Sequence, residues 1–126
     1  LAFKNSMRQF TSDLRGARQR AVSNTLWVRV GNMENANAGD GQSRGIYDIA
    51  ISRDRGTTWE DPISERELEK RSEFDGTPDD IVFLPNGTIV LDPGEYDTTV
   101  TLKSLDDIGK PTYAVKVTVT GKVAAE

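Results

Sequence analysis

Carboxylates are the side chains with which this 126-residue chain could do acid–base or metal chemistry, since it contains no histidine and no cysteine. Paired acids occur at Asp79-Asp80 and Asp106-Asp107, and Asp92, Glu95 and Asp97 lie close together in the sequence. A calcium loop needs several oxygens that converge on one ion, and no segment has the EF-hand spacing. Glycoside hydrolysis needs two carboxyl groups that face each other across a sugar cleft, which a sequence does not place. We interpret these acids as solvated turn residues and predict neither a metal site nor a cofactor.

The absence of histidine and cysteine removes several classes of enzyme. Ser-His-Asp triads, the helical two-histidine zinc motif and thiol catalysis all require residues that the chain lacks. Disulfide bonds are excluded for the same reason. No phosphate-binding loop and no pairing of a nucleophile with a base is visible. We therefore predict that the protein is not an enzyme and has no catalytic residues.

One motif with a specific spacing is the segment from Ser52 to Trp59, which reads Ser-Arg-Asp-Arg-Gly-Thr-Thr-Trp. It resembles the Asp-box, a hairpin turn of sialidases and other β-propellers. In such a turn the carboxylate of Asp54 accepts backbone hydrogen bonds, Gly56 takes a left-handed conformation, and Trp59 packs beneath. The chain is too short for a propeller of several four-stranded blades. We interpret the motif as a structural turn, and a glycan-related role is the alternative.

The elements that position these residues begin with a predicted helix over residues 1–24. Apolar or small side chains recur there every three or four residues, which is the α-helical period. This stripe consists of Phe3, Met7, Phe10, Leu14, Ala17 and Ala21. The helix is long for a domain of this size, so we expect one end to protrude and its four bulky residues to form a partner-binding face. We expect the small residues from Gly16 to Ala21 to let a sheet approach closely; the alternative is that the whole stripe belongs to the chain's own core.

After Asn24 the apolar period changes to two, which is typical of β-strands. The alternating segments are 26–30, 46–51, 100–102 and 115–119. A hairpin is predicted between 81–84 and 88–91, because Asn86-Gly87 is among the strongest turn signals in a sequence.

Two segments between the strands carry other signals. Residues 31–45 are rich in Asn, Gly and Ala and predict a flexible connection. Ser64 and Glu67 have capping-box spacing, which predicts one or two helical turns within 64–73. One long helix followed by strands gives a single α+β domain over residues 1–126, with the helix (about 1–24) packed on antiparallel sheet of a β head (about 25–126).

Three stretches of the chain resemble a known family. Residues 13–24, running into Trp27-Val28-Arg29-Val30, look like the junction of helix and first strand in GspH/FimT-type minor pseudopilins of type II secretion and type IV pilus systems, with Ala17-Arg18 and Ala21 the most specific positions. Residues 81–87 resemble the hairpin of that family, and residues 117–123 its closing strand. Together the three stretches bracket nearly the whole chain in the same order.

The resemblance implies a structural subunit that acts in filament assembly or tip formation, with other pilin or pseudopilin subunits as partners. It also implies an apolar helical segment before Leu1 that anchors the protein in the bacterial inner membrane, with the head in the periplasm or in the assembled filament. The sequence agrees with this expectation, because no stretch of about 20 apolar residues is present. We accordingly expect the transmembrane segment to have been removed.

Charge bears on the remaining alternatives. Residues 1–30 contain six cations and one acid, whereas the whole chain has a net charge of -4, so the β head is acidic. Some relatives take up DNA, but the tail after Gly121 offers only Lys122, and we do not expect nucleic acid as a partner. A rival to the filament subunit is a secreted β-rich module that binds glycan or protein, with its helix closed onto its own core.

Overall fold

The computed structural model describes residues 2–37, 43–106 and 111–125. Helix α1 (Ala2–Asn24) comes first and is followed only by strands, as the α+β prediction requires. The strands are β1 (Trp27–Asn37), β2 (Ser43–Ser52), β3 (Ser64–Glu67), β4 (Ser72–Phe74), β5 (Ile81–Phe83), β6 (Asp97–Ser104), β7 (Thr112–Thr118) and β8 (Val123–Ala125).

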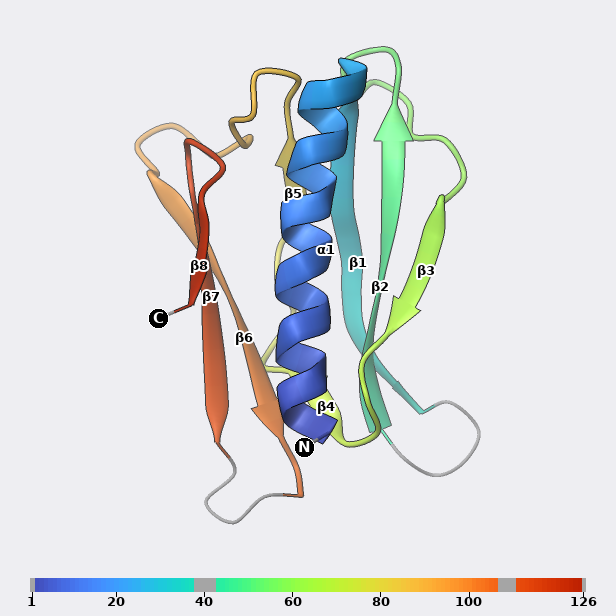
Figure 1. The fold of residues 1–126 in the computed structure, drawn as a ribbon, viewed down its shortest axis with the longest axis vertical. Coiled ribbons are helices and arrows are strands. Elements are labelled where there is room, and N and C mark those ends of the chain that lie inside the picture. Colours follow the sequence, from blue (N-terminus) through green and yellow to red (C-terminus); the bar gives the residue numbers. More distant parts are fainter. Residues whose placement is uncertain (1, 38–42, 107–110, 126) are drawn as a thin grey trace.

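The strands form two antiparallel sheets of four strands each, in the orders β3-β2-β1-β5 and β4-β6-β7-β8. Figure 1 shows the sheets standing side by side, with α1 lying lengthwise over the junction between them. Because the inner face of each sheet and one face of α1 are apolar, the three layers bury one hydrophobic core. The predicted fold class is confirmed.

The centre of the core is an aromatic cluster from three elements. Phe10 of α1 meets Tyr47 of β2 and Phe74 of β4 edge to face, with ring centroids 5.2 and 5.4 Å away. Tyr47 and Phe74 are themselves 6.0 Å apart. Edge-to-face contacts of this kind stabilise a core by about 0.5–1.5 kcal/mol beyond the burial of apolar area. The cluster therefore joins the helix to both sheets.

The bulky residues of α1 are part of this core, which corrects the prediction of a free partner-binding face. Phe3, Phe10 and Leu14 expose only 8%, 0% and 0% of their surface, and Met7 is half-buried and packs against the hydrophobic core. The expected protruding end is also absent from the described part of α1, since the sheets extend along the whole length of the helix (Figure 1). The reason is strand length, because the 11 residues of β1 at about 3.3 Å each reach about as far as the 23 residues of α1 at about 1.5 Å each.

The small residues of α1 behave in two ways. Ala17 and Ala21 are buried against the sheets, at 3% and 0% exposure. Gly16 instead faces solvent, and a Cβ atom built on it would meet nothing within 4 Å. The expected close approach of a sheet to Gly16 is therefore wrong, because Gly16 lies on an exposed flank of the helix, where it lines a hollow together with Ile49 and Ile63.

The two irregular segments of the prediction are largely strand. Residues 31–37 continue β1 past a bulge between Gly31 and Glu34 and pair with the start of β2, so they are not a flexible connection; residues 38–42 lie outside the described residues. The predicted helical turns within 64–73 are wrong as well, because β3 pairs with β2 and β4 pairs with β6. Backbone pairing with a neighbouring strand satisfies these polar segments better than an isolated helical turn.

The hairpin after β5 has the predicted turn. Phe83 and Ile89 form a bridge, and Leu84 N–H donates to the carbonyl of Thr88 at 2.8 Å. Gly87 has φ +87°, a left-handed conformation that favours glycine. The Asn86 side-chain oxygen accepts from the backbone N–H of Thr88 at 3.1 Å, which closes the turn.

Candidate functional site

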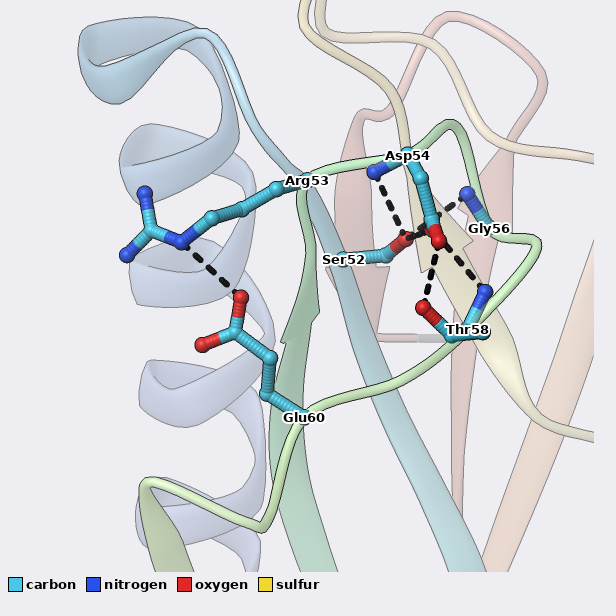
Figure 2. A network of polar contacts seen from close by, with 6 residues as sticks. All are labelled: Ser52, Arg53, Asp54, Gly56, Thr58 and Glu60. Atoms are coloured by element: carbon cyan, nitrogen blue, oxygen red, sulfur yellow. Dashed lines mark hydrogen bonds and ion pairs between the residues drawn. The ribbon is translucent and has the colours of Figure 1, made fainter.

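The Asp-box segment forms a tight loop after β2 (Figure 2). Asp54 accepts a hydrogen bond from the backbone N–H of Thr58 at 2.8 Å and another from the Thr58 hydroxyl. The Ser52 hydroxyl donates to Asp54 at 2.7 Å and accepts from the backbone N–H of Gly56 at 2.8 Å. Gly56 has φ +81°, so the glycine of the motif stands where a left-handed residue is needed.

The hydrogen bonds of this loop change the pKa of its carboxylate, Asp54. The hydrogen bonds from the side chain and backbone of Thr58, together with that from Ser52, lower the pKa of Asp54 to about 2. Asp54 is therefore ionised at neutral pH and is not suited to general acid–base work. Both of its carboxylate oxygens are engaged inside the loop, so the geometry favours a structural turn over a sugar-binding carboxylate.

Two tryptophans hold the loop against the sheet. The Arg29 guanidinium lies 4.9 Å from the centroid of the half-buried Trp59 ring, and Arg29 also pairs with Asp48 at 3.7 Å. A Cβ atom on Gly56 would come within 2.9 Å of the Trp27 ring, so the loop backbone rests directly on that ring. The sequence motif indicated the packing of Trp59 but not the contact with Arg29.

A second glycine turn is tied to the helix by an arginine. Arg18 Nε donates to the carbonyl of Gly87 at 3.0 Å, and Gly121 packs against both groups with φ +84°. A Cβ atom on Gly121 would overlap the Gly87 carbonyl oxygen and the Arg18 side chain. Arg15 repeats the pattern nearby by donating to the carbonyl of Val123 at 3.2 Å. The two arginines thereby fasten α1 to the hairpin and to β8.

We call Lys4, Arg8, Arg15 and Arg18 the basic strip, because their spacing of four, seven and three residues places them along one side of α1. This side faces the β7–β8 sheet, since Arg8 and Arg15 line a groove together with Tyr113 and Ala125. Lys4 and Arg8 are exposed and have no hydrogen bond or ion pair with another element in the described residues. Half of the basic strip is therefore free to meet another molecule.

The other side of α1 carries a polar network that the sequence did not reveal. The Tyr47 hydroxyl donates to Asp13 at 2.6 Å and accepts from the Gln9 amide at 3.1 Å, and Arg66 Nε donates to Asp13 at 2.9 Å. Burial, followed by the hydrogen bond to Asp13, raises the pKa of Tyr47 above its ordinary value of 10.0. The bond to Asp13 also raises the pKa of Arg66. The inward position of Tyr47 in an alternating strand was the available signal.

The chain was compared with known proteins at the level of sequence and of structure. No protein-family model matches the sequence, and no curated protein matches it either. In structure it is similar to the type IV minor pilin FimU of Pseudomonas aeruginosa in two crystal forms, with TM-scores of 0.64 and 0.62 at 14% identity. Both alignments cover 98% of this chain, and they cover 87% and 91% of the two FimU chains. The chain has a minor-pilin fold.

The minor-pilin fold confirms the architecture implied by the resemblance to GspH/FimT-type proteins. The long helix and both antiparallel sheets lie within the matched 98% of the chain, so the likeness is not restricted to one element. No helix in the described ranges combines the length and the apolar character needed to cross a membrane.

Two of the acids that the sequence analysis singled out are bonded within the minor-pilin fold. Asp80 accepts from the backbone N–H of Asn32 at 3.0 Å, and Asp106 pairs with Arg71. Asp107 lies outside the described residues. Within residues 2–37, 43–106 and 111–125, no three acids converge in a way that could hold a metal ion.

Proposed function

We propose that this chain is a structural minor pilin or pseudopilin subunit that acts in filament assembly or in formation of the filament tip. The observation that carries the proposal is the likeness to the type IV minor pilin FimU over 98% of the chain. A type IV pilus and a type II secretion pseudopilus are both compatible with this fold, because fold alone does not distinguish the systems.

The partners that we propose are other pilin or pseudopilin subunits. Since the apolar stripe of α1 is buried inside the domain, neighbouring subunits must contact other surfaces. The exposed residues Lys4 and Arg8 of the basic strip form one such surface. We place the protein at the bacterial inner membrane with its head in the periplasm, or in the assembled filament. The anchor in this proposal is an apolar helical segment that continues α1 in the N-terminal direction.

A structural role also fits the chemistry of the described residues better than catalysis does. The most perturbed carboxylate, Asp54, has both oxygens bonded within its own loop. The same bonding reduces support for the rival function, a secreted module that binds glycan through the Asp-box. A binding module would need a surface that presents free hydrogen-bonding groups to a ligand.

The proposal is tested by locating the native protein. Filaments are sheared from cells, and their proteins are compared by mass spectrometry with those of the membrane fraction and the culture medium. We expect the chain in the membrane fraction and in the sheared filaments. In a strain that lacks the assembly ATPase, and so makes no filaments, we expect it in the membrane fraction alone. Recovery only as a soluble protein in the medium, together with binding on a glycan array, would overturn the filament role in favour of the secreted module.

A further inference from the structure

An apolar patch lies on the head at the end where α1 stops. Val90, Tyr96 and Val119 expose 49%, 77% and 39% of their surface. Their backbones are neighbours, because Val119 N–H donates to the carbonyl of Tyr96 at 2.8 Å and Ile89, next to Val90, donates its N–H to the carbonyl of Val119 at 3.0 Å. Exposed apolar residues that gather in one place commonly mark an interaction surface. We call these three the distal patch.

Acids border the distal patch on one side. Val90 lines a shallow hollow together with Asp79, Asp80, Asp92 and Glu95, and no lysine or arginine lines it. The carboxylate of Asp92 has no ion pair in the described residues, and its own backbone N–H is bonded to Glu95 at 3.2 Å. A surface that fits here must therefore offer apolar area next to positive charge.

The side of the same domain where α1 meets the β7–β8 sheet offers such a surface. A groove of about 330 Å³ runs between α1 and the β7–β8 sheet, and no acid lines it. Its lining residues are Met7, Arg8, Thr11, Ser12, Arg15, Tyr113 and Ala125. Met7 and Tyr113 are half-buried and give it apolar walls, while the exposed Arg8 is a cation without a partner in the described residues.

The two surfaces lie at different levels along the long axis. The distal patch precedes β6 and follows β7, and β6 begins near the C-terminal end of α1 (Figure 1). The groove lies beside the middle of α1, from Met7 to Arg15, and is closed by the start of β7 and the end of β8, which Figure 1 places further down the long axis. Copies that lie side by side, each displaced along the helix axis relative to the last, would bring the patch of one towards the groove of the next.

We propose that the distal patch of one copy of this chain docks into the groove between α1 and β7–β8 of a second copy, with Tyr96 as the anchor and Asp92 facing Arg8. The proposal rests on the proposed function, since it names the contact that a filament subunit would use. Tyrosine is favoured as an anchor because it buries a large area and loses few rotamers. The ion pair sets orientation more than affinity.

This contact is head to tail, so it uses two different surfaces and leaves one of each free. A contact of this kind does not close into a dimer and extends into a row of subunits. A dimer about a two-fold axis would instead bury the same surface of both copies. The two arrangements therefore make different predictions for cross-linking.

Because the chain contains no cysteine, single introduced cysteines report on this contact directly. Thr120→Cys places a thiol beside the distal patch, and Ser12→Cys places one at the groove. We expect disulfide-linked dimers when the two variants are mixed under oxidising conditions, and no dimer from either alone. Thr57→Cys, an exposed position in the Asp-box loop, is the matched control and should not cross-link to Ser12→Cys.

Variants of the contact residues test its chemistry. Tyr96→Ala in the Thr120→Cys copy should abolish the dimer, and Arg8→Glu in the Ser12→Cys copy should have the smaller effect of reducing its yield by about two- to fivefold. Asp92→Arg in the other copy should then restore it, since the ion pair is present with reversed signs. Arg20→Glu is the control, because Arg20 lines a hollow on the opposite side of α1. Unfolding curves that match the parent chain show that each variant is folded.

The outcomes separate this inference from the proposed function. Equal cross-linking of Thr57→Cys, dimers from Thr120→Cys alone, or no dimer from the mixed pair would each overturn head-to-tail docking. If the chain is nevertheless found in sheared filaments, the filament role stands without this contact. If the mixed pair cross-links but the chain is absent from filaments, the docking stands and the filament role fails.

Discussion

The apolar stripe and the basic strip of α1 both join the helix to the sheets, but through different interactions. The stripe does so by burial, with Phe10, Leu14 and Ala21 fully enclosed. The strip does so through directional hydrogen bonds, from Arg15 to Val123 and from Arg18 to Gly87. Burial is proportional to area and needs no exact geometry, whereas an arginine must find a carbonyl at the right distance.

The difference teaches which parts of the helix are available to partners. Every bulky residue of the stripe is at least half-buried, so a change there acts first on folding. The basic strip is divided, since Arg15 and Arg18 are used internally while Lys4 and Arg8 are not. A change at the strip can therefore act on stability or on assembly, depending on the residue.

The largest expected effect is on the apolar stripe. Phe10→Ala removes the central ring of the aromatic cluster and leaves a cavity, so we expect the free energy of unfolding to fall by about 3–5 kcal/mol. Urea unfolding followed by circular dichroism measures the change. Val22→Ala on the same helix is the control; Val22 is 46% exposed, and its effect should stay within about 0.5 kcal/mol. Equal effects at both positions would mean that Phe10 is not a core residue.

The next effect concerns the arginine contact of the basic strip. Gly121→Ala forces a Cβ atom into the Gly87 carbonyl and the Arg18 side chain, in addition to left-handed strain. Gly94→Ala has comparable strain at φ +89° but meets nothing within 4 Å, so it should cost only about 1–2 kcal/mol. We expect Gly121→Ala to cost roughly 1–3 kcal/mol more than this control in the same unfolding assay. Equal losses of unfolding free energy in the two variants would show that the Gly87 carbonyl and the Arg18 side chain can move aside at little cost.

Local patterns predicted more of the fold than of the contacts. The helix period and the alternating strands located α1, β1, β2, β6 and β7, because both periods follow from backbone geometry. The capping-box spacing of Ser64 and Glu67 was misleading, since these residues occur in an edge strand paired with β2. The pairing of β3 with β2 determined the structure here, and a short sequence segment read alone does not show which strand it will pair with.

The predicted partner-binding face was wrong for a related reason. A helical stripe shows that Phe3 and Phe10 seek apolar contact, but the sequence does not say whether that contact lies within the chain. The answer depends on the second sheet, whose β4 residue Phe74 reaches Phe10. The Asp-box is different, because the side-chain hydrogen bonds of Ser52 and Asp54 all lie within seven consecutive residues, from Ser52 to Thr58. Local chemistry could therefore be predicted there in detail.

A smaller effect is expected on the side of α1 that carries Asp13. Tyr47→Phe keeps the ring in the core but removes a hydroxyl that donates to Asp13, so we expect a loss of about 1.5–3 kcal/mol at neutral pH. Urea unfolding of the variant and the parent chain at several pH values measures it. Gln9 also loses an acceptor, but its bond to the Glu67 carbonyl remains.

The pH dependence of this pair sharpens the test. Burial and Asp13 raise the pKa of Tyr47, so the folded state holds the phenolic proton more tightly than the unfolded state. The stabilising contribution is then full below about pH 10 and is lost as the pH rises through the folded pKa. The advantage of the parent chain over Tyr47→Phe should shrink in that alkaline range. An advantage that grows with pH would contradict the assignment.

The smallest expected effect is on the solvent face of α1, at Gly16. Glycine inside a helix costs conformational entropy, and a Cβ atom added here meets nothing within 4 Å. We expect Gly16→Ala to raise the free energy of unfolding by about 0.5–1 kcal/mol, measured in urea against the parent chain. Because the change lies away from the apolar stripe, the groove cross-link of Ser12→Cys should be unaltered. A loss of stability would show that another element covers this face, and the division of α1 into a buried stripe and an open outer face would have to be redrawn.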